Sequence, residues 1–229
     1  MDVNALVDAT ERALQRRGTA TLSVSGDERR WCAICVAVDE SIELRVGEPS
    51  RGWRRWRPAP GEAWLLDHGF VHVIDAWVMP APPGATSHMC AELLAAALRK
   101  GLGAPDDREL AELVLDPGLI GGDTYPVPPT APHAEHIRHV VRALAEAGRG
   151  KVCIQGGRPA VTWAWVFAAE GELELSPEPV ERDPEYGLDW TVAVDAPDLT
   201  AHADRLTALL HDDLGRSAAD PLFVSFMAL

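Results

Sequence analysis

Two short stretches of this sequence carry residue types and spacings that could bind a metal. "HAEHIRH" sets His133, His136 and His139 three residues apart, so neighbouring imidazoles can share a helix face, as zinc ligands do. "CAIC" places Cys32 and Cys35 at the spacing of zinc and redox sites. Whether either stretch can hold a metal depends on the secondary structure that carries it.

The surrounding pattern argues against a metal at either stretch. CAIC lies in an apolar run that reads as a strand, where residues three apart point to opposite faces, so we predict two separate core thiols. The histidines are not accompanied by an HExxH pattern, and we predict a solvated helix start there. We therefore predict no metal ligands and no cofactor.

A third candidate is a pair of aspartates in similar contexts. "VHVIDA" ends with Asp75-Ala76, and "TVAVDA" ends with Asp195-Ala196. An Asp after a strand most simply satisfies backbone N–H groups of the following turn. We read the two as equivalents in a repeated fold, and they would form a carboxylate pair only if the two strand ends met.

Motifs for other enzyme classes are missing from the sequence. There is no GxSxG, and the Gly-rich "LIGGDT" lacks the Lys and the Ser or Thr of a phosphate loop. We predict no catalytic residue and a non-enzymatic protein. The alternatives left open are a small hydrolase or metal-dependent enzyme using the His133, His136 and His139 cluster, and an immunity or structural partner protein.

The stretch "RGWRRWRPAPGEAW" is unusually basic and aromatic for this chain. Trp and Arg are enriched in binding hot spots because they bring large contact area at modest ordering cost. We predict that it contacts a protein or peptide partner, through an acidic or C-terminal peptide segment of that partner. The residues concerned are Arg51, Trp53, Arg54, Trp56 and Arg57.

Composition limits the partners and the compartment. The formal net charge of -14 opposes contact with nucleic-acid phosphates, so neither DNA nor RNA is expected. No apolar run reaches the roughly 20 residues of a membrane-spanning helix, and the first residues lack a signal peptide's basic start. Four cysteines are too few for a disulfide framework in a chain this long. We expect a cytoplasmic bacterial protein.

Internal similarity predicts two copies of one unit. Arg12-Ala13-Leu14 recurs as Arg142-Ala143-Leu144, and later matches follow in the same order with a shrinking offset. Each copy reads as helix, four strands and helix, with Thr86 and Thr200 as N-caps of the closing helices. The predicted fold class is α+β, with antiparallel sheets carrying their helices on one face. The first repeat covers residues 1–116, a Pro/Gly-rich linker 117–132, and the second repeat 133–229.

The long middle strands are apolar on both faces. In the second copy, alternation puts Trp163, Trp165 and Phe167 opposite Ala164 and Val166. The unit's own helices can cover only one face, so the other must meet the second copy, another chain or a bound segment. We therefore add Trp163 and Trp165 to the predicted partner-binding residues.

The order of elements resembles the type III secretion chaperone-like superfamily, which includes the YbjN-like and TY-Chap domains. The residues that carry the resemblance are Gly52-Trp53, "LLDHGF" at 65–70, and the closing helices "ELLAAALRKGLG" and "RLTALLHDDLG". The resemblance implies a non-enzymatic protein that binds a peptide or protein segment, often as a dimer. A chain with two copies would then be a pseudo-dimeric monomer or a homodimer.

Overall fold

The computed structural model describes residues 2–16, 18–47, 61–73, 76–113, 127–128, 130–157, 161–177 and 189–227. It confirms the predicted α+β class, since helices accompany two antiparallel sheets. The chain divides into two compact units at Leu115, with Arg16–Gly18 and Ala37–Glu40 counted in the second unit. Within that second unit, the amide of Val38 donates to the carbonyl of Leu222 at 2.8 Å.

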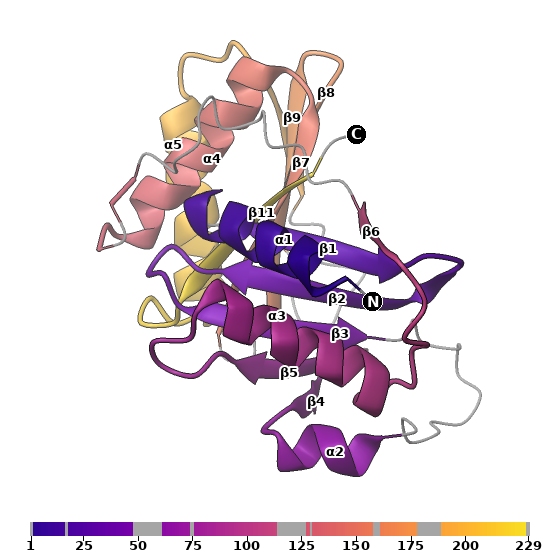
Figure 1. Cartoon of the computed structure of the whole chain (residues 1–229). Coiled ribbons are helices and arrows are strands. Elements are labelled where there is room, and N and C mark those ends of the chain that lie inside the picture. Colours follow the sequence, from indigo (N-terminus) through magenta and orange to yellow (C-terminus); the bar gives the residue numbers. More distant parts are fainter. Residues whose placement is uncertain are drawn as a thin grey trace, which may run out of the picture. The chain divides into compact units, whose positions relative to one another are not determined.

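The first unit contains one sheet in the strand order β4-β5-β3-β2-β1-β6, every neighbouring pair being antiparallel. Figure 1 shows α1 and α3 on the same face of this sheet. The elements are α1 (Val3–Arg16), β1 (Thr19–Val24), β2 (Asp27–Val36), β3 (Ile42–Gly47), α2 (Glu62–Asp67), β4 (Val71–Val73), β5 (Ala76–Pro80), α3 (Ser87–Ala96), the π-helical turn η1 (Ala97–Gly101) and β6 (Leu110–Leu113).

The second unit contains a sheet in the order β10-β9-β8-β7-β11, again antiparallel throughout. Helices α4 and α5 cover one face of it (Figure 1). The elements are α4 (His133–Ala147), β7 (Gly150–Gly156), β8 (Val161–Ala169), β9 (Glu172–Pro177), β10 (Trp190–Ala193), α5 (Leu199–Ala208), the π-helical turn η2 (Leu209–Asp213) and β11 (Leu222–Met227).

Helix α4 shows how the sequence forms this layer. Ile137, Val140, Val141 and Leu144 recur at helical spacing and are all buried in the core against the sheet. The helix ends at Gly148, whose left-handed φ of 67° is favourable for glycine and costly for other residues. The apolar stripe and the glycine stop were both visible in the sequence.

The two units share their strand order once α2 and β4 are set aside. In each, the closing helix passes into a π-helical turn and then a left-handed glycine, Gly103 with φ 68° and Gly215 with φ 64°. The number of residues that separates Gly103 from Gly215 also separates Glu112 of β6 from Val224 of β11, so Glu112 and Val224 hold corresponding positions. Those residues pair with Leu22 and Ile154, and the ladders continue from there across both sheets. The registers thus give a residue-by-residue correspondence between the units.

Several details differ from the sequence prediction. The stretch "GFVHVIDAWV" does not form one strand: β4 and β5 pair antiparallel, with Val71 opposite Val78. The strand that corresponds to β10 is β5, because each of them pairs with the third strand of its unit. VHVIDA therefore does not match TVAVDA in the fold, and β4 is an extra edge strand of the first unit.

Each unit also has a final strand that we did not predict. β6 and β11 follow the closing helices and pair with β1 and β7 respectively. The Thr86 cap is confirmed, since its Oγ1 accepts from the amide of Met89 at 3.2 Å. The Thr200 cap is wrong, because α5 begins at Leu199 with Asp198 as its N-cap residue.

Candidate binding site

The face of the second sheet that lies away from the helices, here called the open face, carries two half-buried aromatic side chains. Alternation along β8 directs Trp165 and Phe167 to this face, because Ala164 and Val166 lie in the core beneath the helices. Large aromatic groups are unusual on a sheet face that the unit's own helices do not cover. They make this face the strongest candidate for contact with another molecule.

A cation lies over both aromatic rings. Lys151 of β7 is paired with Phe167, and its Nζ is 3.4 Å from the ring centroid of Trp165 and 4.6 Å from that of Phe167. A partly desolvated ammonium over an aromatic face is stabilised by the ring's negative quadrupole, by about 0.5–2 kcal/mol. The open face therefore already accommodates a positive charge at its aromatic centre.

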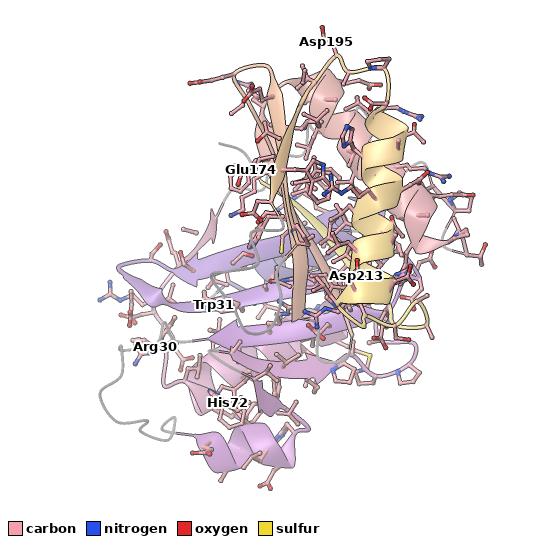
Figure 2. All side chains as sticks on the ribbon, turned by 180° about the vertical axis from the view of Figure 1, so that it is seen from behind. Arg30, Trp31, His72, Glu174, Asp195 and Asp213 are labelled. Carbon is pink, nitrogen blue, oxygen red and sulfur yellow. The ribbon has the colours of Figure 1, made fainter. Side chains whose placement is uncertain are left out.

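The side of the open face near β9 and β10 is acidic. Glu174 pairs with Phe167 across β8 and β9, and Figure 2 shows it on the side of the sheet away from the helices. Glu172 has the same orientation two residues earlier, and both carboxylates are exposed. Asp189 accepts a hydrogen bond from Ser176 Oγ at 2.8 Å. Aromatic and acidic side chains thus lie next to each other on one surface.

Trp163 does not belong to this face, contrary to the sequence prediction. The β7–β8 ladder shifts between Ile154 and Gln155, which pair with Ala164 and Thr162, so Trp163 is the extra residue of a bulge. The bulge turns its indole into the core, where it is 1% exposed. Trp163 is therefore a core residue, and Trp165 alone of the predicted pair remains accessible.

The corresponding positions of the first unit are occupied by small residues. Ala33 corresponds to Trp165, Cys35 to Phe167 and Thr19 to Lys151. On that face Arg45 Nε donates to Glu43 Oε1 at 2.6 Å, and the Glu43 side chain is only 5% exposed. The arrangement of Lys151 over Trp165 and Phe167 is thus not repeated at the corresponding positions of the first unit.

The other predicted partner-binding residues lie outside the described part of the chain. These are Arg51, Trp53, Arg54, Trp56 and Arg57, and Asp75 is also outside it. Asp195 is exposed in the turn that follows β10 (Figure 2). No pairing of Asp75 with Asp195 enters the site described here.

The CAIC thiols lie on opposite faces of β2, as predicted. Cys32 lies between Leu22 and Val46, whereas Cys35 lies between Thr19 and Glu43. Burial raises the pKa of Cys32 to about 12, and burial also raises the pKa of Cys35. Both are free thiols in the core.

The histidines of α4 are not solvated, which corrects the sequence prediction. His133 is 9% exposed and His136 is fully buried. Burial and the charge of Arg142 lower the pKa of His139, with Glu146 acting in the opposite direction. Among the residues that the structure describes, no three His, Cys, Asp or Glu side chains are arranged to hold a metal ion.

His133 instead contacts a histidine that sequence reasoning did not consider. Its Nδ1 lies 3.2 Å from Nε2 of His211 in η2, and both rings lie edge-on to Trp163. Sequence reasoning also missed Lys151 and Glu174. Strand alternation could have placed both on the face of Trp165, once the register of β7, β8 and β9 was known.

Comparisons with protein-family models, curated proteins and solved structures found no match to this chain. Within the described ranges, no helix is long and apolar enough to cross a membrane.

Proposed function

We propose that this protein is a non-enzymatic binding module of chaperone-like character, which holds an extended protein segment against the open face of its second sheet. The observation that carries the proposal is the pair of half-buried aromatic rings, Trp165 and Phe167, on a sheet face that α4 and α5 do not cover. The resemblance of the sequence to the type III secretion chaperone-like superfamily leads to the same proposal.

The aromatic rings supply the energetic basis for binding. Burying apolar surface contributes about 25 cal/mol per Å², and Trp is among the commonest hot-spot residues at protein interfaces. A segment laid over Trp165 would complete the burial of its indole.

The charges of the face indicate the chemistry of the partner. Glu172 and Glu174 are exposed, Asp189 adjoins Ser176, and the whole chain has a net charge of -14. A complementary partner carries positive charge beside apolar residues, because like charges across an interface are costly and opposite charges speed association. We therefore propose a basic, apolar-rich segment in extended conformation.

We further propose that the two units descend from one ancestral unit and have diverged in role. The shared strand order and the matched π-helical turns support common descent. Small residues at the positions of Trp165 and Phe167 support a structural role for the first unit.

Four free thiols, all buried, agree with a site of action in the reducing bacterial cytoplasm.

The test uses two labelled 12-residue peptides, one alternating lysine with leucine and the other alternating glutamate with leucine. Fluorescence anisotropy should show saturable binding of the lysine peptide, weakened at least tenfold in Trp165→Ala, which installs the first unit's residue. The glutamate peptide should bind at least tenfold more weakly than the lysine peptide.

Leu66→Ala is the matched control, since Leu66 is a large apolar side chain of the first unit that is 54% exposed. Equal binding by the wild type and Trp165→Ala, or loss of binding in Leu66→Ala instead, would refute the proposed site.

A further inference from the structure

Two imidazoles connect the start of α4 to the end of η2 in the second unit. His133 Nδ1 and His211 Nε2 are 3.2 Å apart, and the ring centroids are 5.3 Å apart. At this distance the N–H group of one ring donates a hydrogen bond to the unprotonated nitrogen of the other, as two neutral imidazoles can do. The contact therefore requires that one of these two facing nitrogens carries no proton.

The surroundings of the pair disfavour excess positive charge. His133 is buried, and it is the first residue of α4, where the helix dipole presents its positive end. The edge-on indole of Trp163 forms an apolar wall 5.8 Å from the ring of His133 and 6.3 Å from that of His211. These features penalise a charged imidazole at this place.

Two carboxylates act in the opposite direction. The backbone of Asp220, just before β11, hydrogen-bonds to the His133 ring and favours its protonated form, and the charges of the Asp220 and Asp39 carboxylates do the same. Burial and the neighbouring His211 outweigh them, so the pKa of His133 is lowered. One added proton can be accommodated, since N–H⁺···N is a charge-assisted hydrogen bond.

We propose that the His133–His211 pair is a proton-sensitive contact, which holds the start of α4 against η2 while at most one proton is added and opens when both rings are charged. The second proton occupies the last acceptor nitrogen, so two N–H donors and two positive charges face each other. No bond other than the hydrogen bond breaks, and both added protons come from solvent. This device is independent of the binding site on the open face.

The test is a titration of the histidine side chains of the full-length protein by 15N NMR between pH 4.5 and 8. In the wild type, the midpoint of His133 should lie below the ordinary histidine value. In His211→Gln, whose amide can still hydrogen-bond but cannot become charged, the midpoint of His133 should rise towards the ordinary histidine value. His88→Gln is the matched control, because His88 is an exposed histidine in the first unit.

A second measurement follows the contact itself by amide hydrogen exchange in the first turn of α4, at Glu135, whose amide donates to the carbonyl of Pro132 at 3.0 Å. The protection factor of this amide, which corrects for the intrinsic effect of pH on exchange, should fall at least tenfold as the second proton binds. In His211→Gln this fall in protection should be absent. The proposal is overturned if His133 titrates identically in the wild type and in His211→Gln, or if protection of the first turn persists after both rings are charged.

Discussion

The indole of Trp163 packs directly against the backbone of Gly156. A Cβ atom added to Gly156 would lie 2.0 Å from Cζ2 of the indole, far inside the distance that two carbons tolerate. The contact belongs to the bulge that turns Trp163 into the core. Glycine at position 156 and tryptophan at position 163 are thus two parts of one packing arrangement.

Substitution Gly156→Ala should therefore destabilise the second unit. Forcing extra volume into a packed core costs about 1–3 kcal/mol, because side chains and backbone must shift. Denaturant unfolding monitored by circular dichroism measures the change. The loss of unfolding free energy caused by Gly156→Ala should be smaller in a Trp163→Phe background, because the atoms that clash with the added methyl group belong to the six-membered ring of the indole. An equal loss of stability in that background would show that the clash with Trp163 is not the cause.

The buried ion pair of the first unit gives a second prediction. Arg45→Met leaves the carboxylate of Glu43, which is only 5% exposed, without its closest cation, and removing one partner of a buried pair costs about 3–5 kcal/mol. The double variant Arg45→Met, Glu43→Leu should recover much of this loss, because no buried charge is left. Chemical denaturation of the four proteins of this double-mutant cycle measures the coupling. Additive single effects would show that the pair is not coupled.

Stability should depend on pH through His139. Its pKa is lowered in the folded protein, so the unfolded chain binds more protons than the native state as the pH falls below about 6.5, the ordinary value. The stability that His139 contributes is complete above that pH and is lost on acidification towards its folded pKa. His139→Gln should flatten the decline in stability between pH 7.5 and 5, measured by urea unfolding, and His88→Gln, at a histidine that is exposed, is the matched control.

The thiols should be unreactive in the native protein. Cys32, Cys35, Cys90 and Cys153 are all buried, and burial raises the pKa of the first three. Because the thiolate is the reactive form, Ellman's reagent should label none of the four within minutes under native conditions. All four should react after denaturation. Rapid labelling of a native thiol would identify a position that opens locally.

Most helices and strands of the two units could be predicted because local signals define them. The apolar stripe of α4, its Gly148 stop and the alternation in β9 depend on neighbouring residues alone. The final strands β6 and β11 were missed because they pair with the first strands of their units, which lie far away in the sequence. The apolar run "PLFVSFM" was a usable signal for β11.

The site was harder to predict for a related reason. Strict alternation put Trp163 beside Trp165, and one bulge residue reversed the direction of Trp163 alone. Likewise, the absence of an HExxH pattern led us to predict a solvated start of the α4 region, whereas His133 is buried against His211 from a distant element. Bulges and contacts between distant elements depend on packing, which a single sequence does not display.

The return of β11 to β7 also affects how the second unit folds. The β7–β11 ladder joins residues from opposite ends of the unit, so closing it carries a large loop-closure entropy and belongs among its slowest contacts to form. Until β11 docks, β7 presents an unpaired edge, which is the kind of surface on which strands from other chains aggregate. On the ribosome, this unit therefore cannot protect its own edge until nearly its entire length has emerged.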